Sequence, residues 1–181
     1  MISKVNIIGV GDAGLGAILY LLEHNIISSP PTLISSPAKL GERALAVRQS
    51  GRDINLISIK SPIEYSELTY QVYTGFPQNE LTFIVAGLGG PFSSHVVPKL
   101  AEISSKLSKK TTLFGIMPFS FEGEKRKKVA DKTFAQLKNI TDECIQLKNQ
   151  DLFKRANENT SFTEAFEFFN SDILAHIKGA A

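Results

Sequence analysis

FIVAGLGGPFSSHVVP, from Phe83 to Pro98, is the stretch around which the rest of the chain can be arranged. It opens with four apolar residues, Phe83–Ala86, as is typical of a strand buried on both faces. Three glycines within Gly87–Gly90 end the apolar run, Pro91–Ser94 follows, and an amphipathic pattern predicts a helix from about His95. A strand, a glycine loop and a helix in this order present backbone N–H groups to a phosphate, and a tight turn without a ligand is an equally good interpretation.

The amino-terminal region shows the same order of elements. Val5–Val10 is predicted to be a buried strand, and the glycine-rich loop Gly11–Gly16 leads into a helix. Gly9, Gly11 and Gly14 have the GxGxxG spacing of a dinucleotide-binding loop. This spacing indicates a close approach of the backbone, either to a phosphate or to its own helix.

Strand and helix alternate six times along the chain, which predicts the α/β class. We expect a single Rossmann-like three-layer domain over residues 1–181, with a six-stranded, mostly parallel sheet and helices on both faces. Ligands of such sheets bind beyond the carboxyl ends of the strands, where both glycine loops lie. The other expected strands are Thr32–Ser36, Asn55–Ile59, Thr112–Met117 and Cys144–Leu147, and the other expected helices are Ala38–Ser50, Glu64–Tyr73, Glu122–Asn139 and Phe162–Lys178, with a turn at Gly75–Pro77.

Composition excludes several classes of protein. Hydrophobic content of 43%, charged content of 21% and a net charge of +2 are ordinary for a globular protein and show no bias toward nucleic acid. No apolar run is long enough to insert into a membrane, and no signal peptide precedes the first strand, so a cytoplasmic location is expected.

The single cysteine, Cys144, is interpreted as a buried, inert thiol. His24, His95 and His176 lack metal-ligand spacing, and we place His24 and His176 at the surface.

One interpretation of the first glycine loop is an NADP-binding protein or oxidoreductase of Rossmann type. A classical NAD site has an acidic residue at the end of its second strand, where this chain has Ser35 and Ser36. Lys39 and Arg43 are candidates for a 2′-phosphate, and they fit the solvated face of a helix equally well.

Three separated stretches together resemble the nucleotide-binding, amino-terminal domain of the FtsZ/tubulin superfamily, on its bacterial FtsZ side. They are IIGVGDAGLGA (Ile7–Ala17), FIVAGLGGPFSSHVVPKLAEIS (Phe83–Ser104) and MPFSFEGEKRKKVA (Met117–Ala130), of which the last is the most specific. LKNQDLF (Leu147–Phe153) and SFTEAFEFFNSDILAHIKG (Ser161–Gly179) continue the register, the latter resembling the family's long central helix.

The resemblance implies a site for GTP or GDP, with Mg²⁺ as an optional companion and no catalytic residue or resident metal supplied by this chain. The glycine loops would face the phosphates, Glu122 and Arg126 the ribose and phosphates, and Asn149, Phe166 and Asn170 the guanine base. Glu122 with Arg126 also fits a surface ion pair, and Asn149 also fits a simple turn. The implied nucleotide-binding residues are Gly11, Asp12, Ala13, Gly14, Gly89, Gly90, Ser94, Glu122, Arg126, Asn149, Phe166 and Asn170.

The chain departs from the family pattern in its phosphate loop. Where the family has GGGTGTG, this sequence continues from Gly90 with Pro91, Phe92 and, after two serines, His95. Proline lacks an N–H and phenylalanine adds bulk, so nucleotide binding is expected to be weak or lost. Gly16 stands where the family has a nucleotide-facing asparagine.

The resemblance also leads to expectations about activity and partners. The sequence stops before the family's catalytic loop and second domain would begin, so we expect no useful GTP hydrolysis by this chain alone. We expect an assembly or scaffolding module of the cytoskeletal or cell-division type, with a protein partner or self-association, and with no nucleic acid as partner.

Overall fold

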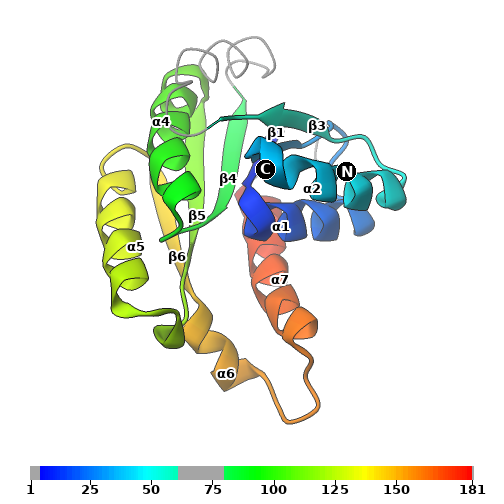
Figure 1. Cartoon of the computed structure of the whole chain (residues 1–181). Coiled ribbons are helices and arrows are strands. Elements are labelled where there is room, and N and C mark those ends of the chain that lie inside the picture. The colour runs from blue at the N-terminus through cyan, green and yellow to red at the C-terminus, as the bar shows by residue number, and fades with distance from the viewer. Residues whose placement is uncertain (1–4, 61–79, 181) are drawn as a thin grey trace.

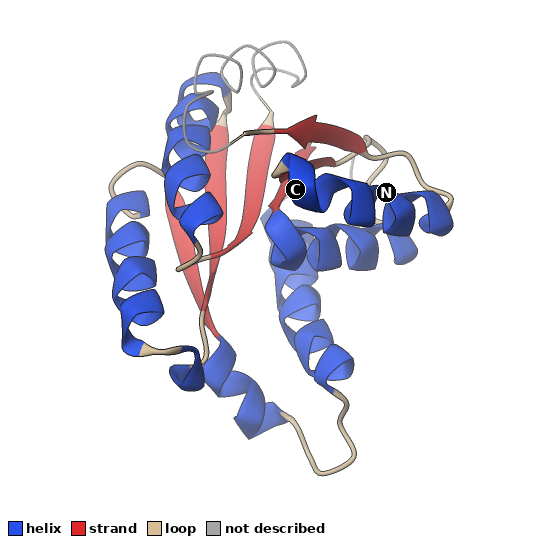
Figure 2. Cartoon of the chain, in the orientation of Figure 1, coloured by secondary structure: helices blue, strands red, loops and turns tan. Residues whose placement is uncertain are grey.

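The computed structural model describes residues 5–60 and 80–180 of the 181-residue chain (Figure 1). The expected helix Glu64–Tyr73 and the turn at Gly75–Pro77 lie outside the described residues. Within the described residues, strands and helices follow one another as the sequence predicts, except that an additional short helix precedes the last one (Figure 2). The strands are β1 Val5–Val10, β2 Thr32–Ser35, β3 Asn55–Ser58, β4 Leu81–Gly87, β5 Lys110–Met117 and β6 Glu143–Lys148; the helices are α1 Gly11–Glu23, α2 Pro37–Ser50, α4 Pro91–Leu107, α5 Glu124–Leu137, α6 Leu152–Arg155 and α7 Phe162–Ala180.

The six strands form one sheet in which every pairing is parallel, in the order β3-β2-β1-β4-β5-β6. The predicted α/β fold is therefore confirmed. Strands β2 and β3 lie on one side of β1, and β4, β5 and β6 lie on its other side, so the strand order reverses between β1 and β4. There Val10 lies opposite Ala86. A crevice opens at such a reversal, beyond the carboxyl ends of the two strands, and ligands of open α/β sheets bind there.

The two faces of the sheet are covered by different helices, because alternate residues of a strand point to opposite faces. Phe83 and Val85 of β4 pack with α1 and α7, whereas Ile84 and Ala86 pack with α4 and α5. Figure 1 shows α4 and α5 on one side of the sheet and α7 on the other. The apolar run at the centre of the sequence is thus buried on both faces, as predicted.

Helix starts differ from the predicted ones at three places. Helix α1 begins at Gly11 without an intervening loop, and α4 begins at Pro91 rather than near His95. Proline is well suited to the first position of a helix, since its fixed φ is already helical and the missing N–H has no partner within the helix. Helix α5 begins at Glu124, because Gly123 has a φ of +97° and separates it from a short 3₁₀ turn at Ser120–Glu122.

The glycines of β1 and α1 serve a close backbone approach. A Cβ on Gly14 would lie 2.4 Å from the carbonyl carbon of Gly9 and 3.0 Å from the backbone oxygen of Val85. A Cβ on Gly9 would likewise lie 2.6 Å from the backbone oxygen of Gly14. Of the two interpretations of this spacing, the structure shows the approach of the strand to its own helix. This contact brings the start of α1 against the carboxyl ends of β1 and β4.

Two sequence-based placements of side chains need correction, and one is refined. The apolar stripe Phe162, Phe166, Phe169, Ile173 and Ile177 of the last helix predicts core packing. Phe162 is nevertheless 67% exposed, because it lies in the first turn of α7. His176, placed at the surface, is half-buried, edge-on to Phe114, with its Nε2 3.4 Å from Glu143. Cys144 is half-buried in β6, and burial raises the pKa of its thiol to about 11, so it stays protonated and unreactive near neutral pH. No helix within the described residues is long and apolar enough to cross a membrane.

Candidate functional site

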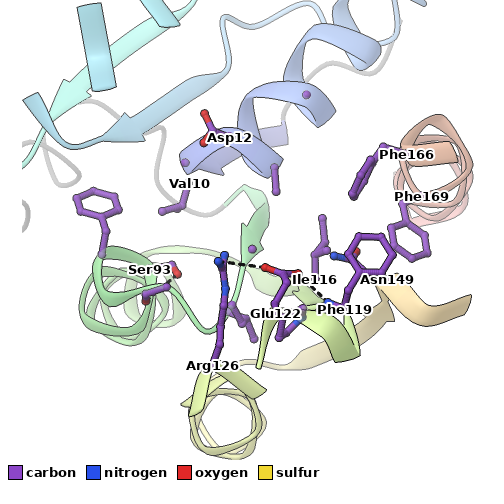
Figure 3. Close-up of a pocket in the computed structure, with 18 of the residues that line it drawn as sticks. Val10, Asp12, Ser93, Ile116, Phe119, Glu122, Arg126, Asn149, Phe166 and Phe169 are labelled. Carbon is purple, nitrogen blue, oxygen red and sulfur yellow. Dashed lines mark hydrogen bonds and ion pairs between the residues drawn. The ribbon is translucent and has the colours of Figure 1, made fainter. Parts of the chain in front are cut away.

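A cavity of about 760 Å³ opens beyond the carboxyl ends of β1 and β4, where the strand order reverses (Figure 3). The starts of α1 and α4 reach it, together with the 3₁₀ turn, α5 and α7. Nine of the twelve predicted site residues line this cavity, so the fold brings together positions from both halves of the sequence. These nine are Gly11, Asp12, Ala13, Gly90, Glu122, Arg126, Asn149, Phe166 and Asn170.

The remaining three predicted site residues, Gly14, Gly89 and Ser94, do not line the cavity. Gly14 is buried against β1. Gly89 has a φ of +90°, and a Cβ there would lie 2.7 Å from the backbone oxygen of Arg126, so this glycine lets the loop after β4 approach α5. The Ser94 hydroxyl donates a hydrogen bond back to the carbonyl oxygen of Gly90 at 2.7 Å. Ser93, one residue earlier, lines the cavity instead.

Glu122 and Arg126 face each other at the cavity, with Arg126 Nη1 3.0 Å from Glu122 Oε2. Glu122 also accepts a hydrogen bond from the backbone N–H of Phe119 at 2.7 Å through its other oxygen. Glu122 therefore stabilises the turn after β5 and fixes the position of the Arg126 side chain. Figure 3 shows Arg126 reaching from α5 toward the start of α1, where Asp12 lies. Within Lys125–Lys128, Arg126 alone lines the cavity.

Aromatic side chains form one end of the cavity. Phe119 is buried, and the ring of Phe121 stacks on it with centroids 4.9 Å apart and planes inclined by 14°. Phe166 meets Phe119 edge-on at 6.3 Å and Phe162 edge-on at 5.0 Å. Phe121 is 71% exposed, which leaves an open aromatic surface at the rim. Flat, apolar surfaces of this kind suit a planar ring such as a nucleobase.

Asn149 lies beside this aromatic end, at the first residue after β6 (Figure 3). Its residue surface is 7% exposed, yet its side-chain oxygen Oδ1 has no hydrogen-bond partner within residues 5–60 and 80–180. A buried polar atom without a partner costs free energy, and most such atoms in native proteins are paired. Because Asn149 also lines the cavity, a donor from a bound ligand can satisfy this oxygen.

Sequence reasoning did not foresee the contact between Arg43 and Asp12. Arg43 of α2 lines the cavity, and its Nε and Nη2 lie 2.8 and 2.6 Å from Asp12 Oδ1. The sequence is compatible with a 2′-phosphate contact or a solvated position for Arg43, but its side chain is only 9% exposed. Phe119 and Phe121 were also missed as lining residues, although the motif PFSFEG places both of them in the turn at the strand end. In the described part of the chain, no cluster of three or more His, Cys, Asp or Glu side chains could hold a metal ion.

Comparison with known proteins connects this fold to one superfamily. The model of the Tubulin/FtsZ family, GTPase domain, matches residues 75–157. The cell division protein FtsZ of Rickettsia typhi is 28% identical over 183 residues, which cover 97% of this chain and 40% of that protein. The structure of an empty FtsZ dimer from M. jannaschii superposes with a TM-score of 0.70 at 23% identity, covering 99% of this chain and 55% of that one. The chain is a divergent FtsZ-like domain.

A further structural match to the FtsZ-like domain is CetZ2 from Haloferax volcanii, solved as a GTPγS-bound protofilament, with a TM-score of 0.70 and 18% identity. The match covers 96% of the FtsZ-like domain and 57% of the CetZ2 chain. In the sequence comparison, the chain spans about two fifths of the length of the Rickettsia typhi FtsZ. The stretch matched by the family model includes α4, the Glu122–Arg126 pair and Asn149, each of which contributes to the lining of the cavity.

Proposed function

We propose that this FtsZ-like domain binds a guanine nucleotide in the cavity between β1 and β4, and that residues 1–181 form one nucleotide-binding domain. The buried Oδ1 of Asn149, for which the described part of the chain offers no hydrogen-bond donor, carries this proposal. Guanine has N–H donors at N1 and N2, and an amide oxygen can accept from them. The aromatic surface beside Asn149, formed by Phe119 and Phe166, would hold the plane of the base.

The opposite part of the cavity suits the phosphates. Helices α1 and α4 both begin there, at Gly11 and just after Gly90. Free N–H groups at a helix start and the helix dipole both favour an anion. Arg126 adds a cation at the same cavity. One end of the cavity would therefore bind the base and the other the phosphates. GTP or GDP matches both ends, and Mg²⁺ would accompany the phosphates that carry it.

Binding should be weaker than in a family member with a full glycine loop. Pro91 occupies the first position of α4, where it removes one of the N–H groups that would face a phosphate. Phe92 lines the cavity and narrows it at the same place. Each lost charge-assisted hydrogen bond costs about 1.5–3 kcal/mol, or roughly one to two powers of ten in affinity.

We further propose that the domain works in an assembly or scaffold of the cytoskeletal or cell-division type, together with a second FtsZ-like subunit as its protein partner. This rests on the relatives, which are named cell division protein FtsZ or were solved as a dimer or a protofilament. The cytoplasmic location and the absence of useful GTP hydrolysis by the 181-residue chain stay predictions. Phosphate release from GTP and Mg²⁺ at high protein concentration tests the latter.

Nucleotide specificity can be tested on the whole 181-residue chain. We expect GTP and GDP to raise its thermal midpoint, since a ligand that binds the folded state stabilises it by mass action. ATP should do so less at equal concentration, and NADPH should have no effect. A preference for NADPH would favour the oxidoreductase alternative, and no shift with any guanine nucleotide up to millimolar concentration would contradict the proposal.

A further inference from the structure

Arg43 is an unusually buried cation at the edge of the cavity. Its side chain is 9% exposed, and α2 places it opposite the first turn of α1. Arginine is almost never buried unless it is paired, and its planar fork of donors suits carboxylates and phosphates. The identity of its counter-ion therefore determines what this residue does.

The observed counter-ion of Arg43 is a poor match for so buried a guanidinium. Both contacts, from Nε and Nη2, end on the same oxygen, Oδ1 of Asp12, instead of bridging two oxygens. The Asp12 side chain is 83% exposed, so water competes for the carboxylate and screens the ion pair. A less hydrated anion inside the cavity would bind the arginine more strongly.

Asp12 lies where an anionic ligand would lie. It is the acidic residue of the first turn of α1, whose free N–H groups and dipole favour negative charge. Figure 3 shows Asp12 across the cavity from Arg126. Because Arg43 contacts Asp12, one arginine lies on each side of the cavity. In the structure, the carboxylate of Asp12 neutralises Arg43.

We propose that Arg43 binds the phosphates of the nucleotide, and that Asp12 is an internal counter-ion which the phosphates displace. Arg43 would in this way supply the donors that Pro91 cannot provide at the start of α4. Lys39, one turn earlier on α2, is not equivalent, because it is exposed and pairs with Glu42 at 3.2 Å. The inference rests on the proposed function, since it names the residue that holds one part of that ligand.

Calorimetric titration of the full chain with GDP and with guanosine separates phosphate contacts from base contacts. We expect Arg43→Gln to weaken GDP binding by about ten- to a hundredfold and to leave guanosine affinity unchanged. Asp12→Asn should strengthen GDP binding several-fold, because the competing carboxylate is gone, and a misfolded variant cannot produce a gain. Arg48→Gln, at an exposed position of the same helix, is the matched control and should change neither affinity.

Three results would overturn the inference. GDP affinity that is unchanged in Arg43→Gln but falls in Arg126→Gln would leave the proposed function in place and remove Arg43 from it. Equal losses of GDP and guanosine in Arg43→Gln would show that the arginine only ties α2 to α1. Failure of the unaltered chain to bind either GDP or guanosine would remove the proposed function itself, and the inference with it.

Discussion

At the scale of single residues, the cavity contains polar groups whose arrangement is poor without a ligand. Asn149 keeps a buried oxygen that no described residue hydrogen-bonds, and Arg43 pairs with an exposed carboxylate. Neither arrangement stabilises the fold by itself. Both are accounted for if the cavity holds a ligand with N–H donors at one end and negative charge at the other.

Replacing Asn149 separates its role in binding from its role in folding. Asn149→Leu keeps the approximate size of the side chain and removes a buried oxygen that has no partner in residues 5–60 and 80–180. We expect the free energy of unfolding of the unliganded chain to stay equal or rise by up to about 1 kcal/mol. GDP affinity should fall by about ten- to a hundredfold, as measured by calorimetry. Asn139→Leu, at an exposed position, is the control; a stability loss with unchanged GDP affinity would make Asn149 a structural residue.

Alanine substitutions at Gly14 and Gly16 of α1 should change the stability of the domain in opposite directions. A Cβ on Gly14 would overlap the backbone of Gly9, whereas a Cβ on Gly16 would have no atom of the described residues within 4 Å. Gly14→Ala should lower the free energy of unfolding by about 1–3 kcal/mol, in line with overpacked cores. Gly16→Ala should raise it by about 0.5–1 kcal/mol, because alanine favours the helix. Urea denaturation measures both, and equal stabilities would contradict the close packing of α1 on β1.

At the scale of elements, the start of α4 combines a regular helix start with the loss of an N–H donor at the cavity. The helix begins with Pro91, and the side chains of Ser93 and Ser94 both donate to the carbonyl oxygen of Gly90. These contacts support a regular helix start, since they tie the first turn to the residue before it. The same proline deprives the cavity of an N–H donor.

The double change Pro91→Ala with Phe92→Thr tests how far this helix start limits binding. It restores an N–H at the first helical position and removes the ring that narrows the cavity. We expect GTP affinity to rise by about tenfold or more, the equivalent of one charge-assisted hydrogen bond. The His95→Gly change alone is the control, because His95 Nδ1 already pairs with the carbonyl oxygen of Pro91 and does not line the cavity. Unchanged or lower GTP affinity in the double variant would show that the start of α4 does not contact phosphate.

Elements were predicted from sequence more reliably than their ends and contacts. The apolar run Phe83–Ala86 determines a strand buried on both faces, because its neighbours in the sheet must cover every residue. The start of α4 was misplaced because Pro91 and two serines resemble a loop, although proline fits the first helical position equally well. The Arg43–Asp12 pair could not be foreseen, since 31 residues separate its members and only the tertiary fold brings α2 beside α1.

At the scale of the whole molecule, the cavity joins the two halves of the sheet. The starts of α1 and α2 belong to the half formed by β3, β2 and β1, whereas α4, the 3₁₀ turn and Asn149 belong to the half formed by β4, β5 and β6. Helix α7 packs against α1 on one face and carries Phe166 to the same cavity. A nucleotide that spans this space would therefore contact both halves at once.

Hydrogen exchange with and without GDP tests this arrangement over the whole domain. Ligand binding slows the local opening of the segments that it contacts. We expect slower exchange simultaneously at the starts of α1 and α4, in Phe119–Glu122, around Asn149 and in the first two turns of α7. The carboxyl-terminal turns of α5 and α4, which lie away from the cavity, serve as internal controls and should change little. A dinucleotide bound in the Rossmann manner would instead protect the ends of β1 and β2 and the start of α1. Protection limited to those segments, with none around Asn149 or Phe166, would contradict a nucleotide that reaches from one half of the sheet to the other.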